Sequence, residues 1–257
     1  LLRCVCWCLA WECAGAVVCV WVWRGVVGCG TGVECGWVCW SGCWVCVVCV
    51  VVRACVPARS CADALSCARV HACDCAHADQ IQGFFEVPVD HLFSSALFIK
   101  DIDTLNLTDL CIASPDMGGA KRAHAYGSKL QAEVVICYKQ RKEANVIDKM
   151  TVIGDVEGKN VILVDDMVDT GGTLCKAAEM LKEKGAKTVR AYCTHGVLSG
   201  PAHERIANSA LEELVIADTI PQTQENPKIR VISVAEMFAQ VMTNVHHHES
   251  ISGHFIM

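Results

Sequence analysis

The fold of this chain is decided by a run of thirteen residues, which reads Val161-Ile162-Leu163-Val164-Asp165-Asp166-Met167-Val168-Asp169-Thr170-Gly171-Gly172-Thr173. Its first four residues are apolar without a break, which is typical of a strand buried on both faces of a parallel sheet. Two carboxylates follow where this strand is expected to end. A glycine-containing loop then leads into apolar residues at helical spacing, up to Gly185. The run therefore predicts a strand, a loop and a helix.

The loop of this unit combines the features of a sugar-phosphate site. A helix N-terminus offers N–H groups to an anion, glycines let the backbone approach closely, and threonine hydroxyls add donors. Carboxylates repel phosphate, but they accept hydrogen bonds from sugar hydroxyls or bind a metal ion. An acidic strand end before an ordinary capped helix is the alternative. The pattern predicts phosphate in the loop and ribose hydroxyls on the acidic pair, with these site residues: Asp165, Asp166, Asp169, Thr170, Gly171, Gly172 and Thr173.

A second unit of the same kind precedes the first. Residues 110–113 read as a buried strand, a loop with two glycines follows, and a helical stretch extends to about Leu130. The loop carries Asp116, which could coordinate the metal of bound phosphates, and Lys121 and Arg122, which could face those phosphates. A polar loop with solvated charges is the alternative.

Strand and helix patterns alternate through the rest of the chain. Further strands are expected at residues 133–138, 188–193, 214–217 and 229–233, an edge hairpin at 151–158 and an amphipathic helix at 235–245. The charged run at residues 139–146 reads by itself as a solvated loop. This alternation predicts an α/β fold with a mainly parallel sheet flanked by helices.

The first 76 residues differ from the remainder in composition. They hold 16 of the 20 cysteines and all seven tryptophans, and they contain no Lys, Asn, Gln, Ile, Met, Phe or Tyr. A secreted disulfide scaffold, a membrane span between Glu34 and Arg53, and a signal peptide are three interpretations. Irregular cysteine spacing and the absence of an aromatic belt disfavour the first two. We favour a spurious translation of a G/T-rich stretch, and expect an unrelated, disordered segment.

Residues 77–257 have the composition of an ordinary globular protein. They carry 17 Lys and Arg against 24 Asp and Glu, which makes this part acidic and disfavours nucleic acid as a partner. Four scattered cysteines (Cys111, Cys137, Cys175 and Cys193) indicate free thiols in a reducing compartment. We therefore expect a cytoplasmic protein with no membrane partner.

Residues 77–257 resemble the 5-phosphoribosyl 1-diphosphate (PRPP) synthetases, also called ribose-phosphate pyrophosphokinases, within the type I phosphoribosyltransferase fold. The loop at residues 165–173, the loop after residue 113 and the segment at 194–201 carry the resemblance. It implies a phosphoribosyltransferase-like domain at 101–257, a remnant of the synthetase N-terminal domain at 77–100, and no genuine domain at 1–76. Residues 194–201 would touch the ribose phosphate or a regulatory nucleotide.

The resemblance also implies roles for residues outside the central loop. Lys139 and Arg141 match a mobile catalytic loop whose cations close over the transferring phosphoryl group. Asp116 matches a metal-binding aspartate, and His77 matches a histidine that helps to hold ATP and its Mg²⁺. The family carries a metal-binding aspartate two residues before that histidine, where this chain has Cys75.

The activity implied is transfer of the diphosphoryl group of ATP to ribose 5-phosphate, which yields PRPP for nucleotide synthesis. The resemblance further implies Mg²⁺ as cofactor, ADP and phosphate as regulators, and a homo-oligomer. Residues 1–76 offer no counterpart of the family's adenine contacts, so we expect this chain to be truncated and weakly active or inactive. The alternatives are a non-catalytic subunit associated with the synthetases, and a phosphoribosyltransferase.

Overall fold

The computed structural model of the chain describes residues 7–13, 16–22, 39–40, 43–44, 50–54, 71–73, 89–140 and 149–254. The chain forms two compact units, one made of Ser94–Val234 and the other of Leu1–Phe93 with Ala235–Phe255. The division into residues 1–76, 77–100 and 101–257 that the sequence suggests stays a prediction.

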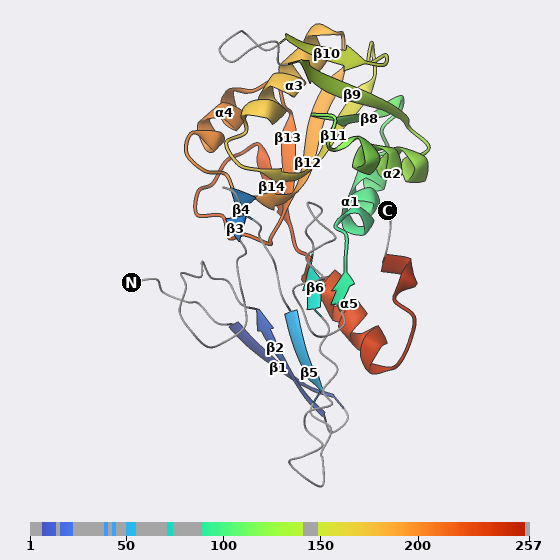
Figure 1. The fold of residues 1–257 in the computed structure, drawn as a ribbon, viewed down its shortest axis with the longest axis vertical. Helices are drawn as coiled ribbons and strands as arrows, with labels where there is room; N and C mark the ends of the chain where they lie inside the picture. Colours follow the sequence, from blue (N-terminus) through green and yellow to red (C-terminus); the bar gives the residue numbers. More distant parts are fainter. Residues whose placement is uncertain are drawn as a thin grey trace. The chain divides into compact units, whose positions relative to one another are not determined.

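The unit within residues 94–234 is built on a seven-stranded sheet in the order β10-β9-β8-β11-β12-β13-β14 (Figure 1). Only the edge pair of β9 and β10 is antiparallel, and all other neighbours are parallel. The predicted α/β fold with a mainly parallel sheet is therefore confirmed. The strands are β8 (Leu110–Ser114), β9 (Glu133–Gln140), β10 (Lys149–Ile153), β11 (Asn160–Val168), β12 (Thr188–Gly196), β13 (Glu213–Ala217) and β14 (Ile229–Ile232).

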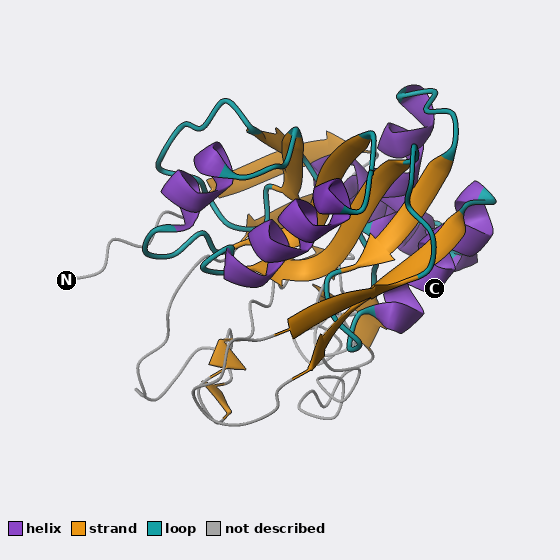
Figure 2. Cartoon of the chain, turned by 90° about the horizontal axis from the view of Figure 1, so that it is seen from above, coloured by secondary structure: helices purple, strands orange, loops and turns teal. Residues whose placement is uncertain are grey.

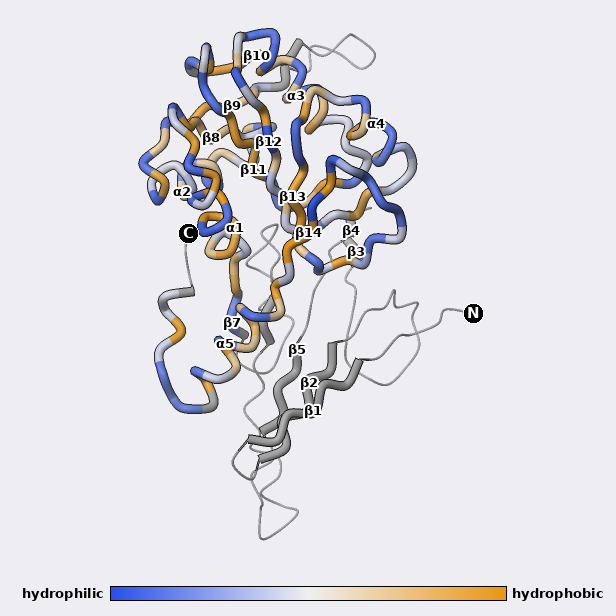
Figure 3. Tube along the Cα trace, turned by 180° about the vertical axis from the view of Figure 1, so that it is seen from behind, coloured by the Kyte–Doolittle hydropathy of each residue, from blue (hydrophilic) through white to orange (hydrophobic). Residues whose placement is uncertain are grey.

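Helices cover both faces of this sheet (Figure 2): α1 (Ser95–Thr104), α2 (Ala120–Leu130), α3 (Gly172–Glu183) and α4 (Ala202–Asn208). Val161 and Leu163 of β11 share one core cluster with Leu181 of α3. Because side chains alternate along a strand, Ile162 faces the opposite side, where Tyr192 of β12 packs edge-on against Phe98 of α1. Burial on both faces explains the unbroken apolar run of β11, and Figure 3 shows apolar colour along the central strands.

Strand β11 extends further than its apolar run predicts. Its pairing with β8 ends at Leu163 opposite Ala113, whereas its pairing with β12 continues to Val168 opposite Gly196. Asp165 and Asp166 therefore lie within the strand and not after it, in the part that projects beyond β8. In these two fully described strands, β11 has no backbone pairing with β8 beyond Leu163, which the sequence pattern of β11 alone does not reveal.

The other unit contains strands where the sequence suggested a disordered segment. A five-stranded sheet orders β1 (Trp7–Cys13), β2 (Ala16–Val22), β5 (Val50–Ala54), β6 (His71–Cys73) and β7 (Val89–His91). Valine and tryptophan favour strands even where the polar alternation is missing. This unit also holds the pair β3 (Cys39–Trp40) and β4 (Cys43–Trp44), helix α5 (Ala235–His246) and the 3-10 helix η3 (Ser252–His254). No helix in the described parts of the chain has the length and apolar character needed to span a bilayer.

Candidate functional site

The order in which the chain adds strands to the sheet reverses between β8 and β11. From β8 the chain continues to β9 and β10 on one side, and from β11 it continues to β12, β13 and β14 on the other. Helix α2, which follows β8, packs on β8 and β9, while α3, which follows β11, packs with β12 on the opposite face. Open α/β sheets bind ligands outside the carboxyl ends of strands at such a switch point. The connections that leave β8 and β11 are therefore the expected place of a ligand site.

Three charged side chains meet at this point. Arg122, in the first turn of α2, places its Nη1 atom 3.1 Å from Oδ1 of Asp165 and its Nη2 atom 3.4 Å from Oδ2 of Asp166. Backbone N–H groups also donate to the pair, from Asp166 to Asp165 Oδ1 at 3.0 Å and from Met167 to Asp166 Oδ1 at 2.9 Å. The side chains of Arg122 and Asp165 are 22% exposed and that of Asp166 is 11% exposed, so the cluster can still be reached by a ligand.

Burial and mutual repulsion act on the two acids of this cluster. The pKa of Asp165 is raised to about 7, mainly by burial and then by the negative charge of Asp166 and a hydrogen bond with its side chain, while Arg122 opposes the rise. One cation thus faces two acids that are partly removed from water. Cys193 of β12 pairs with Asp165 in the sheet, and burial holds the pKa of its thiol well above the usual value, so this thiol stays neutral. A ligand that donates hydrogen bonds to the pair would stabilise its negative charge.

The loop after β11 leads into an N-terminus of α3 suited to an anion. Gly171 precedes the helix with φ of 70°, a left-handed conformation that glycine adopts without strain, and no side chain of this N-cap residue satisfies the helix N–H groups. The first turn, which the structure describes in full, contains no acidic residue. Thr170 and Thr173 are exposed beside it. Free N–H groups and two hydroxyls there can donate to phosphate oxygens.

The connection after β12 holds this loop in place. Backbone N–H groups of Val197 and Leu198 donate to the carbonyl of Val168 at 3.0 and 3.1 Å. The Ser199 N–H donates to the carbonyl of Asp169 at 3.1 Å, and the Ser199 hydroxyl donates to the Asp169 carboxylate. These contacts hold the loop after β11 against the segment at residues 194–201.

A cation from α4 also contacts the loop. Arg205 donates from Nη1 to the carbonyl of Thr170 at 3.1 Å, and the same atom would lie 3.6 Å from a Cβ added to Gly172. Arg205 therefore brings positive charge to the loop that precedes α3.

The connection after β8 is arranged differently. The Gly119 N–H donates to Oδ1 of Asp116 at 2.9 Å, so this carboxylate accepts a hydrogen bond at the N-terminus of α2. A Cβ at Gly119 would lie 2.5 Å from the Ser114 hydroxyl oxygen, so only glycine fits there. Asp116 is exposed, and one carboxylate with water and substrate phosphates is a donor set that suits Mg²⁺. No cluster of three or more His, Cys, Asp or Glu side chains occurs among the residues that the structure describes.

The structure brings some of the predicted site residues together. Asp165 and Asp166 share the Arg122 contact, and residues 169–173 form the loop and helix start beside them. Asp116 lies in the neighbouring connection. Lys139 is on β9, with its side chain outside the described part, and Arg141 and His77 lie outside the described residues.

Three residues take positions that the sequence did not assign. Arg122 was expected to face phosphate and instead pairs with the acidic residues. Ser199 lies in a segment that the sequence singled out, but nothing there signalled its contact with Asp169. Arg205 gave no signal, because a charged residue on a short helix is ordinary and its contact depends on how α4 packs against α3.

Comparisons with known proteins agree with this architecture. A family model described as "Phosphoribosyl synthetase-associated domain" matches residues 145–256. The ribose-phosphate pyrophosphokinase of Campylobacter jejuni is 52% identical over 180 residues, which cover 70% of this chain and 58% of that protein. The corresponding enzyme of Wolinella succinogenes is 51% identical, with the same coverage. This chain thus spans 58% of the length of these relatives.

A solved structure supports the same relationship. The phosphoribosylpyrophosphate synthetase of Mycobacterium smegmatis superposes with a TM-score of 0.62 at 36% identity, covering 70% of this chain and 58% of the other. The similarity to ribose-phosphate pyrophosphokinases predicted from the loop sequences is therefore confirmed over 70% of the chain, and the fold agrees with it.

Proposed function

Because 70% of this chain matches ribose-phosphate pyrophosphokinases, we propose that it carries the ribose 5-phosphate site of a ribose-phosphate diphosphokinase. In that reaction the anomeric hydroxyl oxygen of ribose 5-phosphate attacks the β-phosphorus of ATP. The bond from that phosphorus to the oxygen bridging to the α-phosphorus breaks, and AMP leaves as PRPP forms. The hydroxyl proton is released.

One observation carries this proposal. A carboxylate pair and an uncapped helix N-terminus free of acidic residues lie on one continuous segment, at the switch point of the sheet. The pair accepts hydrogen bonds, which suits ribose hydroxyls, and the helix start donates them, which suits phosphate. In the proposal, Asp165 and Asp166 hold the hydroxyls, and the segment Asp169, Thr170, Gly171, Gly172 and Thr173 holds the 5-phosphate.

The phosphoryl-transfer half of the site is proposed from the family resemblance. Lys139 and Arg141 would stabilise the charge on the transferring group, since phosphoryl transfer depends mainly on positioning and charge. Asp116 and His77 would hold Mg²⁺, and His77 would also contact ATP. When bound, Mg²⁺ neutralises charge on the phosphates. Asp116 would contribute Oδ2, because Oδ1 accepts the hydrogen bond from Gly119.

The remaining assignments are also proposals. A homo-oligomer regulated by ADP and phosphate, working in the cytoplasm, follows from the resemblance. Since the chain spans 58% of its relatives' length, we expect it to bind ribose 5-phosphate or PRPP and to make little PRPP from ATP.

Two measurements on the full chain test this. Titration calorimetry with ribose 5-phosphate should give a binding heat, and Thr173→Ala should weaken the affinity about tenfold by removing a phosphate donor. A coupled assay for AMP release should show little turnover. Absence of heat with ribose 5-phosphate and with PRPP would refute the site, whereas robust AMP release would refute only the expected lack of activity.

A non-catalytic partner of the synthetases is a second candidate, and the description of the matching family model favours it. Such a partner would bind ribose 5-phosphate without turnover, but would change the activity of a complete synthetase when mixed with it. A phosphoribosyltransferase is a third candidate, and a screen of nucleobases with PRPP would identify it by release of diphosphate.

A further inference from the structure

Arg122 occupies a position where a cation is locally unfavourable. It lies in the first turn of α2, which begins at Ala120, and the positive end of a helix dipole disfavours a guanidinium there. Residues that go against a local preference, and are stabilised by contacts elsewhere in the fold, are expected at functional sites. The compensation here comes from the carboxylates of Asp165 and Asp166, the first of which is 43 residues further along the chain.

The guanidinium reaches both carboxylates at once. Its Nη1 atom lies 3.1 Å from Oδ1 of Asp165, and its Nη2 atom lies 3.4 Å from Oδ2 of Asp166. The fork of an arginine is planar and rigid, so one side chain sets the direction of both acids. Backbone N–H groups of Asp166 and Met167 fix them on the strand side. The pair is thus oriented from two directions before any ligand binds.

The carboxylate oxygens of the pair can accept further hydrogen bonds beside those from Arg122. Tight pairs between nitrogen cations and carboxylates have distances of about 2.7–2.9 Å, and both contacts of Arg122 are longer. A carboxylate oxygen can accept more than one hydrogen bond. Sugar hydroxyls can therefore join the cluster without displacing Arg122.

We propose that Arg122 is a positioning residue, which orients Asp165 and Asp166 toward the hydroxyls of the sugar and connects this side of the site to the β8–α2 connection that carries Asp116. The inference rests on the proposed function, because the ligand whose hydroxyls are received is ribose 5-phosphate. Arg122 acts through the two acids and not on the phosphate.

Calorimetry on the full chain tests this role with two sugars, ribose 5-phosphate and 2-deoxyribose 5-phosphate. Arg122→Gln should weaken binding of ribose 5-phosphate about tenfold or more, and should weaken binding of the 2-deoxy sugar less, because that sugar lacks a hydroxyl for the acids. Arg122→Lys keeps the charge but loses the fork, so its affinity should lie between. Lys129→Gln removes an exposed cation from the same helix and should bind as the unaltered chain does.

A double-mutant cycle separates positioning from general damage. If Arg122 acts through the pair, the losses from Arg122→Gln and Asp166→Asn should not add, since each already disrupts the same cluster. Equal losses for both sugars, or additive losses in the cycle, would overturn the inference.

The outcomes also distinguish the inference from the proposed function. Binding by the unaltered chain, with Arg122→Gln within about twofold of it, would overturn the role of Arg122 and leave the proposed function intact. No binding by the unaltered chain would overturn both. If Arg122→Gln loses its cooperative melt, Arg122→Lys decides, and full affinity of that variant for both sugars would exclude positioning by the fork.

Discussion

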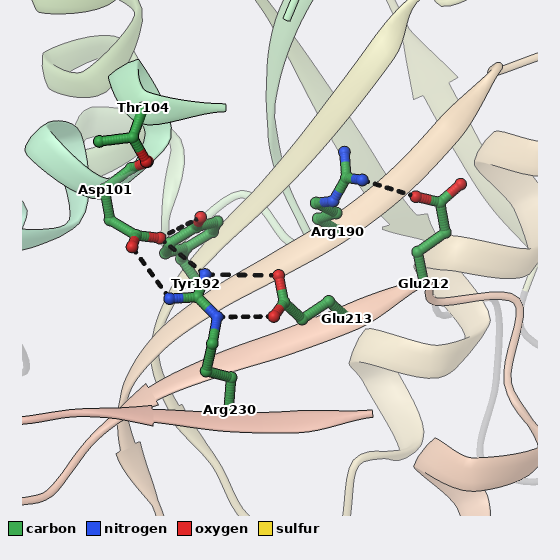
Figure 4. A network of polar contacts seen from close by, with 7 residues as sticks. All are labelled: Asp101, Thr104, Arg190, Tyr192, Glu212, Glu213 and Arg230. Carbon is green, nitrogen blue, oxygen red and sulfur yellow. Dashed lines mark hydrogen bonds and ion pairs between the residues drawn. The ribbon is translucent and has the colours of Figure 1, made fainter. Parts of the chain in front are cut away.

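Arg230 and Arg122 each lie between two carboxylates, and the two clusters differ in the length of the contacts between arginine and acid. Arg230 of β14 donates to Asp101 of α1 at 2.9 and 2.8 Å and to Glu213 of β13 at 2.6 Å (Figure 4). Tyr192 donates a further hydrogen bond to Asp101 at 2.7 Å. In the Arg122 cluster the contacts are longer, at 3.1 and 3.4 Å, and two acids adjacent in sequence share them.

The ionisation of the acids follows the geometry. The hydrogen bonds from Arg230 lower the pKa of Asp101 below its usual value, against the effect of burial. Burial and the neighbouring Asp166 raise the pKa of Asp165 to about 7 in spite of Arg122. The network of short contacts joins α1 to the sheet and favours stability. We expect the longer contacts of the Arg122 cluster to leave its acids able to bind a ligand. Substitutions in and around the two clusters should distinguish them.

Arg230→Gln should lower the free energy of unfolding by about 2 kcal/mol, because it leaves two close carboxylates without their shared donor; the value allows for solvent screening of a side chain that is 37% exposed. Urea unfolding followed by circular dichroism measures this change. Lys100→Gln, which removes an exposed cation next to Asp101 on α1, should change little. A loss for Arg230→Gln no greater than that of the control would mean that this network is not a stabilising one.

Asp101→Asn should cost about 1–2 kcal/mol at neutral pH, since the charged hydrogen bonds to Arg230 are lost. The pKa of Asp101 is lowered from 3.8 in the folded chain, so its ionised form stabilises the fold above that pH, and this contribution is lost as the pH falls below it. The difference between variant and unaltered chain should therefore shrink in acid. Unfolding curves at pH 7 and pH 3 measure it, and a difference independent of pH would contradict the assignment.

Asp165→Asn should stabilise the fold, in contrast to Asp101→Asn, and raise the free energy of unfolding by about 1 kcal/mol at pH 8. It should also weaken ribose 5-phosphate binding. The pKa of Asp165 rises from 3.8 to about 7 on folding, so the folded chain binds more protons than the unfolded chain between these values, and stability falls as the pH rises through them. The gain should thus be absent at pH 4. Asp103→Asn, an exposed acid on α1, is the matched control, and a loss of stability at pH 8 would show that the acidic pair is well compensated.

Ser199→Ala should have the smallest effect on stability, a few tenths of a kcal/mol, because the hydroxyl and its Asp169 partner are exposed. It should nevertheless weaken ribose 5-phosphate binding about two- to fivefold, since the loop before α3 loses one of its anchors. Calorimetry and unfolding curves measure the two effects separately. Equal free-energy losses in binding and in folding would place Ser199 among ordinary stabilising residues.

Local sequence patterns predicted most of the fold. The unbroken apolar run of β11, the helical spacing after Gly172 and the alternation of elements up to Ala235 depend on neighbours a few residues apart, and the same periods govern side-chain burial. The residue types of the 165–173 segment likewise pointed to a sugar-phosphate site. The sequence by itself therefore determined the α/β class and the location of the candidate site.

Only the tertiary structure decided how the charges are paired. Arg122 reaches Asp165 across 43 residues, and Arg230 reaches Asp101 across 129. Such pairs depend on the strand order, which places β8 beside β11 and β14 at the sheet edge, and no local period encodes that order. The projection of β11 beyond β8 also depends on its partner β12. Because Coulomb and hydrogen-bond energies depend on distance in space, the difference between the Arg230 cluster and the Arg122 cluster arises only after the sheet has formed.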